Sequence, residues 1–214
     1  MVKPVITQAA ELAGFGPVIP VIVIDDAARA VDLAHALIQG GVRVLEITLR
    51  TPNALAAIAA VASAVPDAIV GAGTVRTADD ARRAADAGAA FAVCPGFSTS
   101  VDAACRTLSL PLLPGAVTAS EVMAAADAGH RFLKFFPAAS SGGVAALAAM
   151  ASPFADITFC PTGGIRLENA PDYLRLSNVR CVGGSWLVPA AAIQSGDWST
   201  ITTLAREASQ LPAG

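Results

Sequence analysis

Lysine is scarce in this 214-residue sequence, because twelve of its 14 basic residues are arginine and only Lys3 and Lys134 are lysine. Charge of either sign is limited as well, since charged residues make up 14% of the chain and the net charge is −3. The sequence therefore lacks the basic excess with which proteins bind nucleic acid by releasing counterions. Hydrophobic residues make up 54%, which excludes a disordered chain, because so apolar a chain can bury enough surface to offset its conformational entropy.

Histidines and paired cysteines are lacking too. The two histidines, His35 and His130, lie far apart in the sequence. The four cysteines form no Cys-x-x-Cys pair; they are Cys94, Cys105, Cys160 and Cys181. This pattern disfavours a metal site built from imidazole and thiolate ligands, and we expect neither a metal nor another cofactor. It favours reduced, buried thiols, which are typical of a cytoplasmic protein.

The sequence has no long apolar run that could act as a targeting or membrane-spanning segment. Residues 1–16 lack the basic start and apolar centre of a secretory signal. The longest uncharged stretch, residues 135–155, has the length of a membrane span, but it contains Pro137, Pro153 and a Ser-Ser-Gly-Gly run. We therefore expect no membrane association and a cytoplasmic location.

Eight short runs rich in β-branched residues alternate with alanine-rich stretches along the chain. The runs begin near residues 18, 42, 68, 90, 111, 131, 156 and 179. The stretches between them start at Asp, Ser or Thr and end at Gly, most clearly at 25–40, 77–88 and 118–129, as capped helices do. This alternation predicts parallel strands covered by helices, and eight units predict an α/β fold, the (β/α)8 or TIM barrel. We expect one domain over residues 1–214, with a short N-terminal helix at 6–12 and an extra C-terminal helix at 198–209.

An open, dinucleotide-binding sheet is the alternative to a barrel. The nearest match to its glycine fingerprint, residues 71–76 (GAGTVR), has Arg76 where the third glycine should stand. The sequence therefore favours the barrel.

Polar side chains at the C-terminal ends of the strands are the candidates for function, because the active sites of such barrels lie there. In residues 42–50 (VRVLEITLR), side chains alternate between two faces, which places Glu46, Thr48 and Arg50 on the barrel interior. A buried glutamate needs a partner or a chemical role. A structural ion pair between Glu46 and Arg50 is as consistent with this pattern as a catalytic carboxylate.

The sixth run places a lysine among apolar residues. Lys134 shares a face with Phe132 and Phe136 in RFLKFF (131–136). Apolar surroundings disfavour an ammonium ion, and a neutral amine attacks a ketone to form a Schiff base. A lysine that extends to solvent, or one that is neutralised by Glu46, would fit the same strand position, so the pattern alone does not separate these interpretations.

Two pairs of glycines follow the seventh and eighth runs, in PTGGI (161–165) and VGGSW (182–186). Glycines let backbone N–H groups approach an anion closely, and the loops after these two strands are the usual phosphate site of such barrels. Ordinary turns are the alternative for each pair. Thr74 and Pro95 complete the predicted rim, with Thr74 placed to bind a carboxylate beside Arg50. His130 lies at the opposite end, where structural residues are expected.

Five segments of the sequence form a recognisable set in a fixed order. They are GVRVLEITLRT (41–51), IVGAGTV (69–75), KFFPA (134–138), FCPTGGI (159–165) and GGSWLVP (183–189). The set resembles the 2-keto-3-deoxy-6-phosphogluconate aldolase family over essentially the whole chain. The resemblance implies a homotrimeric (β/α)8 enzyme, a metal-independent class I aldolase and hence a lyase. Such an enzyme cleaves 2-dehydro-3-deoxy-6-phosphogluconate (KDPG) to pyruvate and glyceraldehyde 3-phosphate in the Entner–Doudoroff pathway of carbohydrate metabolism. Many members also cleave 4-hydroxy-2-oxoglutarate (KHG) to pyruvate and glyoxylate.

The resemblance also implies a role for each candidate residue. Lys134 would form the Schiff base, and Glu46 would transfer protons. The other implied contacts are Arg50 and Thr74 with the substrate carboxylate, Pro95 and Phe136 along the pocket wall, and Gly163, Gly164, Gly184 and Ser185 with the phosphate. The sequence departs from the family pattern at residues 139–141 and at Cys94, which leaves substrate preference open. An aldolase for the 6-phosphogalactonate epimer, a metal-free phosphosugar isomerase and a non-catalytic phosphosugar-binding barrel are the alternatives.

Overall fold

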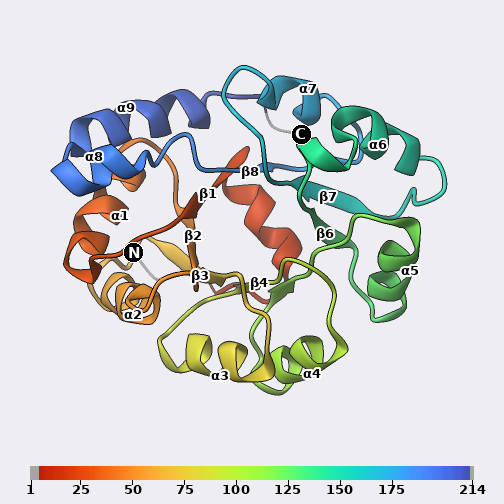
Figure 1. Cartoon of the computed structure of the whole chain (residues 1–214), viewed down its shortest axis with the longest axis horizontal. Helices are drawn as coiled ribbons and strands as arrows, with labels where there is room; N and C mark the ends of the chain where they lie inside the picture. Colours follow the sequence, from red (N-terminus) through yellow and green to blue (C-terminus); the bar gives the residue numbers. More distant parts are fainter. Residues whose placement is uncertain (1–4, 213–214) are drawn as a thin grey trace.

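Eight parallel strands form a ring at the centre of residues 5–212, the part of the chain that the computed structural model describes (Figure 1). They are β1 (Val18–Ile22), β2 (Val44–Thr48), β3 (Ile69–Gly73), β4 (Ala92–Val93), β5 (Leu112–Leu113), β6 (Phe132–Phe135), β7 (Thr158–Pro161) and β8 (Val182–Gly184). Neighbouring strands follow the order β5-β4-β3-β2-β1-β8, and β6 pairs with β7. Every one of these pairings is parallel.

Two isolated bridges join these strands into a closed barrel. Gly115 pairs with Lys134 between β5 and β6, and Thr162 pairs with Gly183 between β7 and β8. At the first of them the backbone N–H of Lys134 donates to the carbonyl oxygen of Pro114 at 2.8 Å. The predicted (β/α)8 barrel is therefore confirmed, and β2 and β6 lie on opposite sides of the ring.

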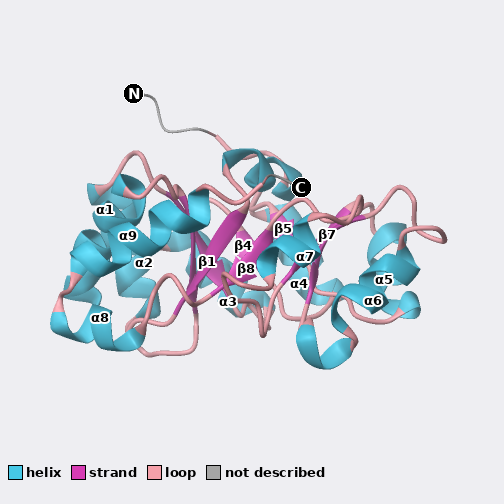
Figure 2. Cartoon of the chain, turned by 90° about the horizontal axis from the view of Figure 1, so that it is seen from above, coloured by secondary structure: helices cyan, strands magenta, loops and turns pink. Residues whose placement is uncertain are grey.

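Helices surround the strands on the outside of the barrel (Figures 1 and 2). They are α1 (Ala30–Gln39), α2 (Ala54–Ala64), α3 (Ala78–Asp86), α4 (Thr99–Thr107), α5 (Ala119–Asp127), α6 (Gly143–Met150), α7 (Ala170–Leu174), α8 (Ala190–Ser195) and α9 (Trp198–Ser209). The described residues also form the 3₁₀-helices η1 (Ala9–Phe15), η2 (Ala27–Arg29) and η3 (Ala139–Ser141). The C-terminal helix predicted at 198–209 is confirmed as α9. None of the helices within residues 5–212 has the length and hydropathy to cross a membrane.

Side-chain caps explain where several helices begin. Thr77 and Thr118 accept hydrogen bonds from the backbone N–H groups of Asp80 and Glu121, at 3.0 and 3.3 Å. Each forms a reciprocal capping box, which satisfies two N–H groups that the helix itself leaves unpaired. The helices predicted at 77–88 and 118–129 are thereby confirmed as α3 and α5.

The short N-terminal helix predicted at 6–12 is present as the 3₁₀-helix η1, but it begins and ends three residues later, at Ala9 and Phe15. The carboxylate of Glu11 accepts hydrogen bonds from the backbone N–H groups of Thr7 and Gln8, at 3.3 and 3.0 Å. These bonds cap the segment at Gln8, so the residues before it stay outside the helix. Similarly, the stretch predicted as one helix at 25–40 starts as η2, since Asp26 caps a tight turn before α1.

Two apolar layers follow from the alternation of side chains along the strands. Leu45 and Ile47 of β2 face the helices in the main core, whereas Val44 faces the barrel interior. The interior cluster also contains Leu12 of η1, and Figure 1 shows this red helix across the centre of the ring. Because η1 closes the N-terminal end, the polar interior positions near Glu46 open only towards the C-terminal end.

Candidate active site

The side chains of Lys134 and Glu46 meet inside the barrel, although they start from strands on opposite sides of it. Lys134 Nζ donates hydrogen bonds to Glu46 Oε1 at 3.0 Å and to Oε2 at 3.4 Å. The two side chains are only 6% and 3% exposed. An isolated buried charge is costly, so each group requires the other. Lys134 therefore does not extend to solvent, and the ionic partner of Glu46 is Lys134 rather than Arg50.

This buried pair can change its protonation without leaving a bare charge in the barrel. A proton that moves along the hydrogen bond from Nζ to Oε1 converts the ion pair into a neutral amine and a neutral acid. The ammonium form also lies 5.4 Å from the centroid of the Phe136 ring, within the range of a cation–π contact. The site can thus hold Lys134 as a cation and release it as a nucleophile.

Arg50 and Thr74 lie next to each other at the mouth of the barrel. Arg50 Nε donates to Thr74 Oγ1 at 3.3 Å. Thr74 has a φ of 60°, in the left-handed region that β-branched residues avoid. Strain of this kind persists only where the surrounding structure imposes it, and it is common at functional sites. The result is a guanidinium and a hydroxyl side by side, an arrangement that can bind a carboxylate.

Two threonine hydroxyls anchor the segment that carries Arg50. Thr48 Oγ1 donates to the carbonyl oxygen of Ile22 at 2.9 Å, and Thr51 Oγ1 donates to that of Ile24 at 2.6 Å. Both acceptors belong to the end of β1 and the residues after it. The exposed Arg50 therefore lies between two fixed points on the neighbouring strand.

A cavity of about 180 Å³ opens beside Lys134 at the C-terminal end of the barrel. Most of the predicted site residues line it: Arg50, Lys134, Phe136, Gly163, Gly164, Gly184 and Ser185. Glu46 and Thr74 join them through their hydrogen bonds to Lys134 and Arg50. Pro95 follows β4 at the same end of the barrel but lies outside this lining.

The cavity also contains residues to which the sequence assigned no role. Val21, Val23 and Thr162 are among its lining. Val21 and Val23 share a face by the alternation of β1, but apolar residues at a strand end carry no distinctive chemical signal. Thr162 is buried and belongs to the PTGGI segment, so its position before the two glycines was the signal that could have identified it.

The first glycine pair lies in a backbone conformation that favours glycine. Gly163 and Gly164 have φ values of 98° and 74°, and a Cβ atom on Gly164 would lie 2.5 Å from Ala139 Cβ. The backbone N–H groups of Ala138 and Ala139 donate to the carbonyls of Thr162 and Gly163, at 2.8 and 3.0 Å. This loop is therefore held against the segment that follows Lys134, and the missing side chain of Gly164 allows that close approach, while both glycines line the cavity.

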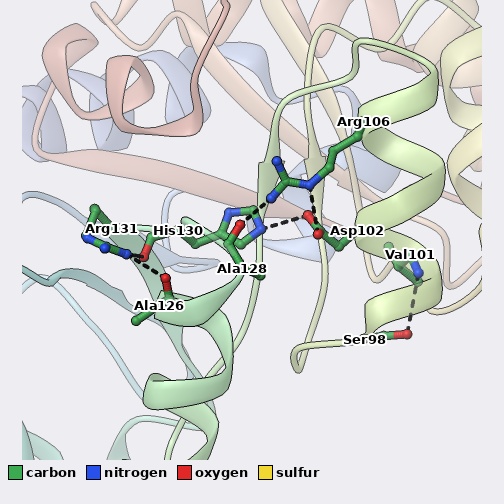
Figure 3. A network of polar contacts seen from close by, with 8 residues as sticks. All are labelled: Ser98, Val101, Asp102, Arg106, Ala126, Ala128, His130 and Arg131. Atoms are coloured by element: carbon green, nitrogen blue, oxygen red, sulfur yellow. Dashed lines mark hydrogen bonds and ion pairs between the residues drawn. The ribbon is translucent and has the colours of Figure 1, made fainter.

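A larger cavity, of about 650 Å³, lies at the opposite end of the barrel beside His130. Three of its polar side chains bind one another: His130 Nε2 contacts Asp102 Oδ1 at 2.8 Å, and Arg106 Nε donates to Asp102 Oδ2 at 2.9 Å (Figure 3). Burial alone would raise the pKa of Asp102, but the hydrogen bonds from Arg106 and His130 hold that pKa below its ordinary value. This network links α4 to the loop before β6, in keeping with a structural role for His130.

The cysteines are free and buried. Burial raises the pKa of Cys105 to about 11 and raises the pKa of Cys94 above its ordinary value. Both thiols are therefore protonated at neutral pH and are poor nucleophiles. Among residues 5–212, no group of three or more His, Cys, Asp or Glu side chains is placed to hold a metal ion.

Known proteins resemble this chain along most of its sequence. A sequence model of the family described as "Aldolase: KDPG and KHG aldolase" matches residues 10–204. A 2-dehydro-3-deoxy-phosphogluconate aldolase of Dickeya dadantii is 54% identical over 202 residues, which cover 94% of this chain and 95% of the relative.

Solved structures agree with this similarity. A KDPG aldolase of Legionella pneumophila, with pyruvate captured as a covalent carbinolamine, superposes with a TM-score of 0.93 at 45% identity over 95% of this chain and 99% of the other. A KDPG aldolase of Zymomonas mobilis with 3-phosphoglycerate gives 0.91 at 45% identity over 96% of each chain. A structure described as native KDPGal is less similar, with a TM-score of 0.76 at 28% identity over 91% of this chain and 97% of the other. By its sequence and by its barrel, this chain belongs to the KDPG and KHG aldolase family.

Proposed function

We propose that this protein is a metal-independent class I aldolase that cleaves KDPG to pyruvate and glyceraldehyde 3-phosphate, and KHG to pyruvate and glyoxylate. The observation that carries the proposal is the amine of Lys134, buried 3.0 Å from the carboxylate of Glu46 beside a cavity at the barrel mouth. A carbinolamine such as that in the Legionella structure is the adduct that an amine forms with the ketone of pyruvate.

The first stage is formation of the Schiff base. Glu46 accepts the proton of the Lys134 ammonium, and the neutral amine attacks the C2 ketone of the substrate. Glu46 then returns a proton to the carbinolamine hydroxyl, which leaves as water. The product is an iminium between Nζ and C2, whose positive charge draws electrons from the neighbouring carbon–carbon bond.

The second stage breaks the bond between C3 and C4. Glu46, directly or through a water, accepts the proton of the C4 hydroxyl, C4 becomes the aldehyde carbon, and the electrons of the C3–C4 bond pass into the iminium to form an enamine. Glu46, directly or through a water, protonates C3 of the enamine. Hydrolysis of the resulting imine releases pyruvate and restores the amine of Lys134.

Groups at the cavity hold the two ends of the substrate. Arg50 binds the carboxylate through paired hydrogen bonds, together with the hydroxyl of Thr74. The phosphate lies at the opposite side, on the backbone of Gly163, Gly164 and Gly184 and on the hydroxyl of Ser185. Phe136 forms an apolar wall beside the reacting carbons, and Pro95, which lies outside the cavity lining after β4, would form the outer part of this wall.

The gluconate substrate is favoured over its galactonate epimer. The relatives named for KDPG are markedly more similar to this chain than the structure described as native KDPGal. We also propose that the chain acts as a single domain in a cytoplasmic homotrimer, an assembly that the resemblance implies and that the mass of the protein in solution tests.

Borohydride reduction in the presence of pyruvate tests the proposal. Lys134 is the only lysine within residues 5–212, so a reduced adduct there is assigned by a single peptide. We expect one pyruvate per chain on Lys134 and none on Lys134→Arg. A coupled lactate dehydrogenase assay with KDPG, its galactonate epimer and KHG then ranks the substrates. A binding-only barrel would give no adduct, and an isomerase would turn over a sugar phosphate without releasing pyruvate.

A further inference from the structure

The inward face of β3 carries no side chain at two successive positions, Gly71 and Gly73. Both belong to the GAGT segment, which is not a dinucleotide fingerprint in this barrel. Neither glycine has a positive φ, so the backbone conformation would accept an ordinary L-residue at both positions. Glycine at these two positions is therefore explained by the neighbouring atoms that occupy the space a Cβ atom would need.

A different side chain occupies each of these spaces. A Cβ atom on Gly71 would lie 2.5 Å from Cε1 of Phe91, which packs in the apolar interior cluster. A Cβ atom on Gly73 would lie 2.6 Å from Cγ and 2.8 Å from Cδ of Glu46, and closer still to Oε1. Real Cβ atoms do not approach other heavy atoms this closely, so a side chain at position 73 and the observed position of Glu46 exclude each other.

The oxygen that Gly73 accommodates, Oε1, is the one that accepts the shorter hydrogen bond from the lysine. Glu46 is opposite Gly71 in the β2–β3 register, and Thr48 is opposite Gly73. The glutamate side chain therefore leans along β3 to reach the space above Gly73, where Oε1 accepts the 3.0 Å hydrogen bond from Lys134 Nζ. A shift of Oε1 by about 1 Å would take this bond outside hydrogen-bonding distance.

We infer that Gly73 is a positioning residue for the aldolase reaction: its missing side chain sets where the Glu46 carboxylate lies relative to the Lys134 amine. This inference rests on the proposed roles of those two residues. Gly73 touches no substrate in this scheme and acts only through Glu46. A methyl group at position 73 would leave the binding groups at Arg50 and Ser185 in place, while moving the proton-transfer group.

The kinetics of Gly73→Ala test whether this change affects proton transfer and leaves substrate binding intact. Because a displacement of about 1 Å at a reacting group can cost about 100-fold in rate, we expect kcat to fall about 100-fold with KM changed less than about threefold. The exchange of pyruvate C3 protons with deuterium, which follows proton transfer alone, should fall in parallel, and the pH profile of kcat should shift. The final yield of borohydride-trapped adduct gives the fraction of sites that can form the Schiff base. If the loss of kcat reflected only misfolding, this yield would fall and kcat per trapped site would equal that of the wild type. Such a result, or a wild-type kcat, would overturn the inference.

A stability cycle tests the contact without relying on activity. Glu46→Ala removes the atoms that a methyl at position 73 would meet, so Gly73→Ala should lower Tm by several degrees in the wild type and by much less in the Glu46→Ala background. If Glu46→Ala is too unstable, the same comparison is made with Lys134→Met present in both members of the pair. An equal loss of Tm in both backgrounds would contradict the contact.

A matched glycine provides the control. Gly14 is exposed, and a Cβ atom there meets nothing within 4 Å, so Gly14→Ala should keep the wild-type kcat. The pyruvate adduct on wild-type Lys134 distinguishes a failure of the proposed function from a failure of the proposed role of Gly73. If Lys134 of the wild type forms no adduct with pyruvate, the proposed function fails; if it does and Gly73→Ala has the wild-type kcat and pH profile, only the role of Gly73 fails.

Discussion

Lys134 Nζ and Glu46 Oε1 lie 3.0 Å apart across the interior of the barrel, on side chains that are 88 residues apart in sequence. Their strands, β6 and β2, face each other across the ring, so the pair exists only when the barrel is closed. The Lys134–Glu46 contact therefore depends on closure of the barrel. A barrel that failed to close at the Gly115–Lys134 bridge would separate the amine from the carboxylate.

Glu46→Gln should remove proton transfer while keeping the shape of the site. The amide can still hydrogen-bond Lys134, but it cannot accept its proton, and loss of a general acid–base group typically costs about 10²–10⁴-fold in kcat. We expect that loss in the coupled assay, with the Lys134 adduct still trapped by borohydride after longer incubation with pyruvate. A kcat within threefold of wild type would exclude Glu46 as the base.

The stability of the buried pair should be strongly non-additive. Lys134→Met or Glu46→Leu alone leaves one charge buried without its partner, which costs about 3–5 kcal/mol, whereas replacing both with apolar side chains is often neutral or stabilising. For a chain of this size, 1 kcal/mol corresponds to about 2–4 °C in Tm. We expect each single variant to lose roughly 10 °C. The double variant should melt near or above the wild type, although it is inactive. Additive losses in thermal unfolding would mean that the two charges do not depend on each other.

Replacing Thr74 with glycine should raise the thermal stability of the protein and weaken substrate binding. Its φ of 60° is unfavourable for a β-branched residue, so Thr74→Gly should relieve strain of about 1 kcal/mol and raise Tm by a few degrees. The same change removes the hydroxyl beside Arg50, and loss of a hydrogen bond to a charged group should raise KM about tenfold. Thr74→Ser keeps the hydroxyl and should bind substrate nearly as wild type. A lower Tm for Thr74→Gly would show that the left-handed conformation is not strained.

The barrel could be predicted because its signals are local and repeated. Capping residues such as Thr77 and Thr118 mark helix starts within the sequence itself, and α9 has the predicted bounds. The predicted bounds of a helix were wrong where a side chain bound the backbone next to it. At η1 the carboxylate of Glu11 accepts hydrogen bonds from the N–H groups of Thr7 and Gln8, so the helix begins only at Ala9. The short strands β4 and β5 begin later than the apolar runs that contain them, because strand bounds depend on partners far away in sequence.

The candidate site could be predicted residue by residue but not as a geometry. The alternation of side chains along the strands correctly placed Glu46 and Lys134 on the barrel interior. It could not decide whether Glu46 pairs with Arg50, nor whether Lys134 extends to solvent or binds Glu46. That choice depends on which strands face each other in the closed ring. The left-handed Thr74 runs against its own conformational preference, so only the surrounding structure can impose it. The role of Gly73 was hidden because glycine carries no chemical group.

The Asp102 network predicts acid sensitivity at the end of the barrel away from the active site. The pKa of Asp102 is lowered in the folded protein, so its contribution to stability is complete above the unfolded value of about 3.9 and is lost as pH falls through the lower folded value. The Asn side chain of Asp102→Asn carries no charge at any of these pH values, so it lacks this pH-dependent contribution to stability. We expect its Tm to lie below that of the wild type at pH 7 and the gap to narrow as pH falls below about 4.

Thermal unfolding of both proteins between pH 7 and 3 measures this gap. Asp127→Asn, at an exposed position on α5, is the matched control and should follow the wild-type profile. The kcat of Asp102→Asn at pH 7 should equal that of the wild type, because the network with His130 and Arg106 lies beside the cavity at the opposite end of the barrel from Lys134. Parallel Tm profiles for Asp102→Asn and the wild type would mean that the carboxylate has the same pKa in the folded and unfolded protein, and that its bonds to Arg106 and His130 add no charge-dependent stability.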